Sequence, residues 1–112
     1  TDTVPAARFD LTYSLLVLHH IDDVKDMLAK FCAVLKPNGY LIVADLDKED
    51  GTFHEKGRTD FFHQGFARGE LQKMVEATGF GDVKFSTPYV IRKKVDGAEK
   101  DFPVFLMVAR KN

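Results

Sequence analysis

Residues 9–18 read Phe9-Asp10-Leu11-Thr12-Tyr13-Ser14-Leu15-Leu16-Val17-Leu18 and run directly into His19-His20-Ile21-Asp22-Asp23. Apolar side chains are nearly continuous along this stretch, whereas a strand with one face in solvent would alternate strictly. The pattern therefore predicts a strand over Phe9–Leu18 that is buried on both faces of a parallel sheet.

A crossover unit follows the two histidines. Asp22 or Asp23 is a suitable helix N-cap, and Pro37 with Asn38-Gly39 predicts that the helix ends near Lys36. The apolar positions of this helix recur at helical spacing and are Val24, Met27, Leu28, Phe31, Val34 and Leu35. A second buried strand, Tyr40–Leu46, comes next, so the two strands are expected to be parallel with a right-handed connection.

The second half of the chain predicts a loop, a helix and a hairpin. Residues 47–66 lack periodicity and are expected to form a long loop, with a helical turn near residues 60–63. Arg68–Thr78 has the spacing of a short helix that Gly79 ends.

Two final strands are expected over Val83–Ile91 and Phe102–Arg110. Pro88 interrupts the first of them, which suits an edge position or a bulge. Asp96-Gly97 is a turn signal between them, so the two strands should be antiparallel.

Composition narrows the class of protein. The chain has 112 residues, 45% hydrophobic and 29% charged, which is typical of one globular domain. Its net charge of -1 does not favour nucleic acid or an anionic membrane as a partner. The single cysteine, Cys32, cannot form an intrachain disulfide, and neither a spanning apolar run nor a secretory signal is present, so we expect a cytoplasmic location.

Taken in order, these elements resemble the second half of a class I S-adenosylmethionine-dependent methyltransferase of the small-molecule type. The resemblance rests on residues 9–21, on Leu35-Lys36-Pro37-Asn38-Gly39-Tyr40-Leu41, on Asp45 and on the closing hairpin. It implies an α/β fold, a partial Rossmann-like sheet of two parallel strands plus an antiparallel hairpin with flanking helices. Residues 1–112 would be a single domain, the C-terminal half of that fold.

One part of the family pattern has no counterpart in these residues. The Gly-rich loop after the family's first strand and the acidic residue ending its second strand do not occur here. Such glycines let the backbone approach the ligand, and the acid holds the ribose hydroxyls. The resemblance therefore implies that this chain forms one wall of the crevice, binds S-adenosyl-L-methionine only together with the other half, and does not turn over alone.

The resemblance also assigns candidate site residues. Ser14, Leu15, Leu16 and His20 would contact the cofactor, with the backbone near Ser14 facing its methionine end. His19 follows the end of the strand, where a base that deprotonates the methyl acceptor is needed, and histidine suits that task. The competing interpretations are a serine hydrogen-bonded within the sheet and a histidine pair that serves as a structural hinge.

Other polar residues receive structural interpretations. Asp45 and Asp47 could face the crevice, but loop capping is favoured. The spacing of Asp45, Asp47, His54 and His63 matches no known metal-ligand pattern, so no metal is expected. The aromatic residues of the long loop could form a substrate lid or anchor the loop, and they are Phe53, His54, Phe61, Phe62, His63 and Phe66. Arg92-Lys93-Lys94 is interpreted as a solvated hairpin end.

Two alternatives remain at this point. The chain could be a non-catalytic interaction module, because an apolar edge strand is a template for pairing with another chain. That predicts a homodimer or domain-swapped oligomer joined through Phe9–Leu18. Half of a nucleotide-dependent dehydrogenase is less attractive, because those sheets usually end in parallel strands.

Overall fold

The computed structural model describes residues 8–49, 53 and 63–112, with the side chain of His19 left out. In chain order its elements are β1 (Phe9–Leu15), the short 3-10 helix η1 (Leu18–His20), α1 (Val24–Val34), β2 (Leu35–Leu46), α2 (Arg68–Thr78), β3 (Phe80–Val95) and β4 (Ala98–Lys111). The predicted helical turn near residues 60–63 falls largely on residues 60–62, which lie outside the described part.

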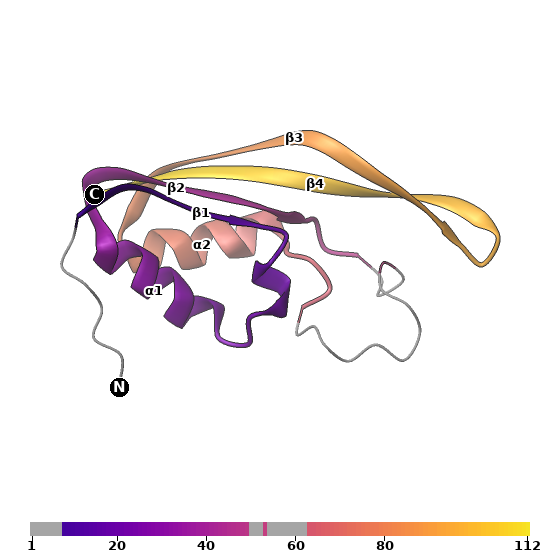
Figure 1. The fold of residues 1–112 in the computed structure, drawn as a ribbon, viewed down its shortest axis with the longest axis horizontal. Helices are drawn as coiled ribbons and strands as arrows, with labels where there is room; N and C mark the ends of the chain where they lie inside the picture. Colours follow the sequence, from indigo (N-terminus) through magenta and orange to yellow (C-terminus); the bar gives the residue numbers. More distant parts are fainter. Residues whose placement is uncertain (1–7, 50–52, 54–62) are drawn as a thin grey trace.

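The four strands form one sheet in the order β1-β2-β4-β3. β1 and β2 are parallel, whereas β4 is antiparallel to both of its neighbours. Both helices lie against the same face of this sheet (Figure 1). The predicted pair of parallel strands followed by an antiparallel hairpin is therefore confirmed.

The prediction that the first strand is buried on both faces is wrong for the described chain. β1 ends at Leu15, not Leu18, and Leu11, Tyr13 and Leu15 are 49%, 64% and 54% exposed. The reason is that both helices lie on one face of the sheet (Figure 1). Thr12 and Ser14 pair with the buried Leu41 and Val43 on the core face, so Leu11, Tyr13 and Leu15 point to the other face. Leu18 is fully buried, but it belongs to η1.

α1 begins as expected and ends slightly early. The side chain of Asp23 accepts a hydrogen bond from the backbone N–H of Asp26 at 3.0 Å, so Asp23 is the N-cap. The helix stops at Val34, two residues before Lys36, and β2 starts at Leu35 rather than at Tyr40. The residues that predicted a turn, 36–39, still interrupt the pairing, because Phe9 pairs with Leu35 whereas Leu11 pairs with Tyr40.

The second half follows the predicted plan with longer strands. Gly79 ends α2 in the left-handed conformation at φ 119°, and Asp96 and Gly97 form the hairpin turn at φ 51° and 82°. The β3–β4 register shifts between Ser86 and Tyr89, so the bulge expected at Pro88 is confirmed. Residues 92–95 and 98–101 are strand, because the ladder continues to the turn.

The main core lies between the sheet and the two helices. β2 and β4 alternate inward and outward, and the helices add Leu28, Leu71 and Val75. The fully buried residues that the sheet contributes include Leu41, Val43, Phe105, Met107 and Ala109. A smaller cluster of Leu46, Phe102 and Val104 lies beside Phe53.

Candidate active site

The carboxyl ends of β1 and β2 meet at the same edge of the sheet because the strands are parallel. Ser14 pairs with Val43 and Leu15 with Ala44. Leu16 leaves the strand with φ 54°, and its N–H donates to the carbonyl of Ala44 at 2.7 Å. Ligands of open α/β sheets bind beyond such carboxyl ends, which makes this edge the place to look for a site.

Four of the five predicted site residues can be located there by their side chains. Ser14 is half-buried, Leu15 and Leu16 are 54% and 41% exposed, and His20 is half-buried in η1. The N–H of His20 donates to the carbonyl of Val17 at 2.9 Å, which closes the tight turn after the strand. His19 lies in η1, but its side chain is outside the described part, so its role stays a prediction.

The outer edge of β1 presents backbone groups as well as side chains. The N–H groups of Arg8 and Leu16 donate to Val34 and Ala44, so the even-numbered residues of this strand bond toward β2. Alternate residues of a strand direct their backbone groups to opposite sides in the sheet plane. The backbone groups of Leu11, Tyr13 and Leu15 therefore face outward.

The two acids at the end of β2 have different surroundings. Asp45 is fully buried, and its carboxylate accepts a hydrogen bond from the N–H of Leu46 at 2.7 Å. Asp47 receives two parallel bonds from the Arg68 guanidinium, at 2.7 and 2.9 Å. Asp45 thus makes a local contact that suits the capping interpretation, whereas Asp47 connects β2 to α2.

Arg68 connects α2 to the sheet. Its Nη2 also donates to Thr87 Oγ1 at 2.7 Å, and the guanidinium lies 5.9 Å from the ring centre of Phe85 and 6.0 Å from that of Phe105. The hydrogen bond with Asp47 raises the pKa of Arg68 above its usual value, and the attraction of the Asp47 charge adds to this, while desolvation by burial acts in the opposite direction. The first turn of α2 is thereby held at the carboxyl end of β2.

The two ends of the long loop are joined by backbone hydrogen bonds. The N–H of Lys48 donates to Phe66 at 3.0 Å, that of Glu49 to Gln64 at 2.9 Å, and that of Phe66 to Leu46 at 2.9 Å. Gly65 has φ 74° and lies directly against the backbone of Asp47. The segment that leads into α2 is therefore fastened to the end of β2.

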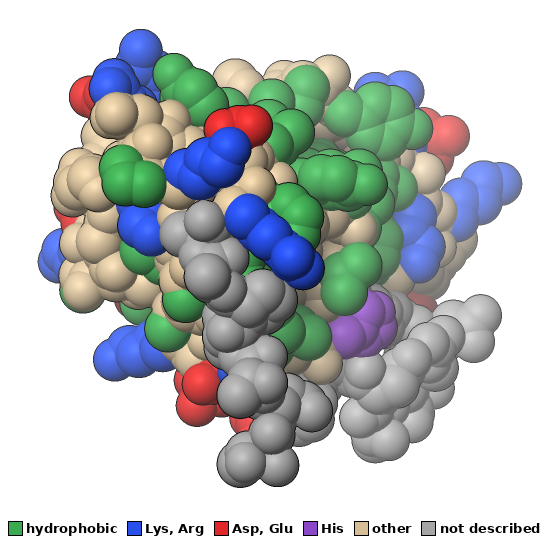
Figure 2. All heavy atoms as spheres, turned by 60° about the vertical axis from the view of Figure 1, so that its left-hand side comes forward, with side chains coloured by type: hydrophobic (Ala, Val, Ile, Leu, Met, Phe, Trp, Pro, Cys, Tyr) green, Lys and Arg blue, Asp and Glu red, His purple; other side chains and the backbone are tan. Residues whose placement is uncertain are grey.

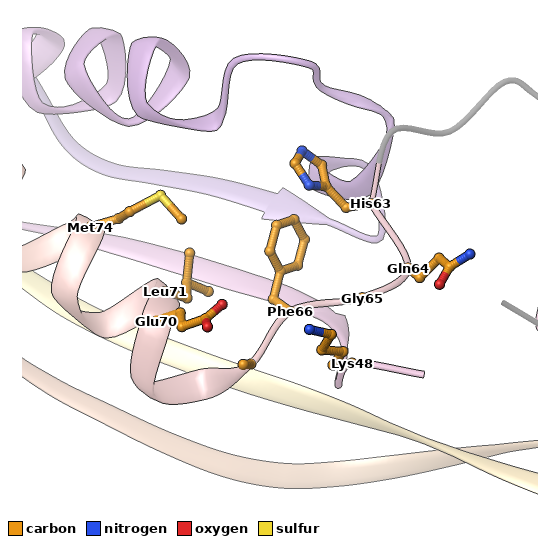
Figure 3. A pocket seen from close by; sticks show the side chains of 9 residues that line it. Lys48, His63, Gln64, Gly65, Phe66, Glu70, Leu71 and Met74 are labelled. Carbon is orange, nitrogen blue, oxygen red and sulfur yellow. The ribbon is translucent and has the colours of Figure 1, made fainter. Parts of the chain in front are cut away.

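A cavity of about 410 Å³ opens beside this joined segment (Figure 3). Phe66, Leu71 and Met74 supply its apolar wall, and His63 stands at one end with its ring 5.1 Å from that of Phe66. The other lining residues are Lys48, Gln64, Gly65, Ala67 and Glu70. His63 Nε2 lies 2.9 Å from the carbonyl oxygen of Ile21, which follows η1, so the cavity adjoins the end of β1.

The described loop aromatics lie in two places, and the substrate lid stays a prediction. Phe53 packs edge to face on Phe102 at 5.2 Å, and Lys93 donates to its carbonyl, so Phe53 anchors the loop on the hairpin. His63 and Phe66 instead line the cavity. His54, Phe61 and Phe62 lie outside the described residues. Within residues 8–49, 53 and 63–112, no three metal-ligating side chains come together.

Sequence reasoning did not single out His63 as a site residue. The sequence analysis placed it among the loop aromatics and in the rejected metal set. Its contact with Ile21 joins positions 42 residues apart, and no local pattern signals such a contact.

Two curated relatives that resemble this chain are methyltransferases. Ubiquinone biosynthesis O-methyltransferase of Rhodopseudomonas palustris is 37% identical over 49 residues, which cover 44% of this chain and 19% of that protein. Phosphoethanolamine N-methyltransferase 1 of Zea mays is 28% identical over 116 aligned residues, covering 95% of this chain and 23% of that protein. The chain thus spans about a fifth of the length of these curated relatives.

The fold has a clear counterpart among solved structures. An S-adenosylmethionine-dependent methyltransferase of Thermotoga maritima superposes with a TM-score of 0.71 at 20% identity, over 98% of this chain and 60% of that one. Finally, residues 1–84 match the family model described as a methyltransferase domain. Because that match covers most of the chain, which also has the family's parallel β1–α1–β2 unit, the protein belongs to the methyltransferase domain family.

Proposed function

We propose that this chain is part of an S-adenosylmethionine-dependent methyltransferase that acts on a small molecule. The observation that carries the proposal is the carboxyl end of β1, an edge strand with outward backbone groups and exposed apolar side chains. A further strand on that side would complete a crevice at the point where strand order reverses. Residues 1–112 would then be the C-terminal half of the catalytic domain.

The residues present fit one wall of a site for such a cofactor. Leu15, Leu16 and Val17 offer apolar surface, at 54%, 41% and 51% exposure, and Leu15 adds an outward N–H and carbonyl. An amphipathic ligand with an amino-acid end needs both kinds of contact. When bound, S-adenosylmethionine supplies an electrophilic methyl group on a sulfonium. Ser14 and His20 are proposed to border the same wall, and His19 is retained as a candidate base.

The isolated chain is expected to bind S-adenosylhomocysteine only weakly and to show no turnover. The physical reason is that the Gly-rich loop and the ribose-binding acid have no counterpart in these residues. Amide NMR shifts on titration with the ligand should concentrate at residues 14–17 and at His20. Residues 92–99 of the distant hairpin serve as the internal control and should not shift.

Two results would contradict this assignment. Submicromolar binding in isothermal titration would mean that these residues form a complete cofactor site. Shifts confined to the hairpin or to α2 would place the ligand elsewhere.

We also propose that residues 1–112 on their own associate with a second copy through the outer edge of β1, the edge that the further strand would otherwise cover. Figure 2 shows patches of hydrophobic side chains between basic residues on one side of the molecule. The exposed large apolar residues of β1 are Phe9, Leu11, Tyr13 and Leu15. An edge strand with outward backbone groups and exposed apolar residues pairs readily with another strand. Light scattering should give the mass of a dimer at high protein concentration, and Tyr13→Lys should shift the equilibrium to monomer.

The matched control for association is Tyr89→Lys, which places the same charge on the opposite edge strand at a similarly exposed position. It should leave the dimer intact. A monomer at every concentration, or equal effects of the two substitutions, would refute pairing through β1.

The cellular location and the enzymatic role of the chain remain predictions. The free thiol of Cys32 supports the expected cytoplasmic location. In the described residues no helix is long and apolar enough to cross a membrane. Membership of the methyltransferase family favours the enzymatic interpretation over a purely non-catalytic interaction module.

A further inference from the structure

The hydrogen bond of His63 determines which of its ring nitrogens carries the proton. Nε2 lies 2.9 Å from the carbonyl oxygen of Ile21, and a carbonyl oxygen only accepts. Nε2 must therefore donate. In the neutral imidazole the other nitrogen, Nδ1, is then left with a lone pair and can accept a proton.

The His63 side chain lines the cavity. Figure 3 shows its ring beside that of Phe66 at one end, and the two ring centres are 5.1 Å apart. In the described part of the chain, Nε2 makes the one hydrogen bond of this side chain, so Nδ1 has no protein partner there. Nδ1 is thus a proton acceptor at one end of the cavity, on a ring that the hydrogen bond of Nε2 holds in place.

The rest of the cavity indicates what would lie against it. Phe66 and Leu71 are buried, and with Met74 they form a broad apolar wall. Lys48 and Glu70 are exposed and of opposite charge, so the lining carries no strong net charge. A volume of about 410 Å³ is within the range of small-molecule sites. These features favour a neutral, flat, apolar body over an ionic ligand.

We propose that His63 is a catalytic residue and that the methyl acceptor is an aromatic hydroxyl compound whose O–H donates to Nδ1. This inference rests on the proposed function. In the transfer, the acceptor oxygen forms a bond to the methyl carbon and the carbon–sulfur bond of the donor breaks. The acceptor proton passes to Nδ1, and the electron pair of the broken bond stays on the sulfur as a neutral thioether. His63 is thus a second candidate base beside His19, whose side chain lies outside the described part.

The test uses the free 112-residue chain with phenol as the probe and anisole as its methylated counterpart. Long-range ¹H–¹⁵N NMR should show His63 protonated at Nε2, with its signals identified by their loss in His63→Gln. Phenol should shift the Nδ1 resonance of His63. Anisole has no proton to donate and should bind about tenfold more weakly, the usual effect of losing one hydrogen bond.

The controls separate this inference from the proposed function. Tyr89→Ala, on the far edge strand β3, should keep phenol binding, whereas His63→Gln should reduce it to the level of anisole. The phenol titration contains no methyl donor, so its result does not depend on whether S-adenosylhomocysteine binds. A free-protein signal showing His63 protonated at Nδ1, or equal binding of phenol and anisole, would overturn the proposal. The tautomer is read in the unsubstituted chain, so a misfolded variant does not affect it.

Discussion

Phe105→Ala is expected to lower the free energy of unfolding by about 3–5 kcal/mol, the usual cost of removing a buried phenylalanine. Phe105 is fully buried in the middle of β4, and its ring packs edge to face on Phe85 at 5.6 Å. The Arg68 guanidinium also lies over it. Small domains are stable by only about 5–15 kcal/mol, so this variant should lose much of its stability in urea denaturation followed by circular dichroism.

Tyr89→Ala is the matched control, because it removes an aromatic ring that is 62% exposed on the neighbouring strand. Surface changes of this kind usually alter stability by no more than about 0.5 kcal/mol. Similar midpoints for the two variants would show that Phe105 is not the centre of the core.

Gly65→Ala should cost about 2–4 kcal/mol and disturb the cavity. The backbone of Gly65 has φ 74°, which strains any other residue by about 1–3 kcal/mol. A Cβ there would also overlap the backbone carbonyl of Asp47, which cannot move without breaking the joined ends of the loop. Because His63 and Phe66 flank this position, binding of phenol should fall together with stability.

Gly69→Ala tests the same substitution four residues later. Gly69 is in α2 with no atom within 4 Å of the added Cβ, so alanine is tolerated and should stabilise by up to about 1 kcal/mol. Equal stability of the Gly65→Ala variant and the unsubstituted protein would refute the close approach at Asp47.

The losses of stability expected for Phe105→Ala and Gly65→Ala are physically connected. Phe105 supports the Arg68 guanidinium, Arg68 holds Asp47, and Asp47 lies against Gly65 at the cavity. Core, helix and loop thus meet at the carboxyl edge of β2. A substitution that breaks one of these contacts should therefore displace His63, although it does not contact His63 directly.

Local patterns in the sequence determined most of the fold. The cap at Asp23, the stop at Gly79, the turn at Asp96-Gly97 and the bulge around Pro88 each depend on the conformational preference of a few adjacent residues. Such preferences act within a turn or two, so they can be recognised along the chain. The parallel pairing of β1 and β2 could also be predicted from the sequence, because the connection between these strands is a helix.

Tertiary structure decided the burial of β1 and the composition of the cavity. Whether an apolar strand is buried depends on what covers each face of its sheet, and only the placement of both helices on one face leaves Leu11, Tyr13 and Leu15 exposed on the other. The cavity joins residues 48, 63–67 and 70–74, and the proton position on His63 is set by the carbonyl of Ile21. Contacts between residues so far apart in sequence leave no periodic signal, because they form only when the chain folds.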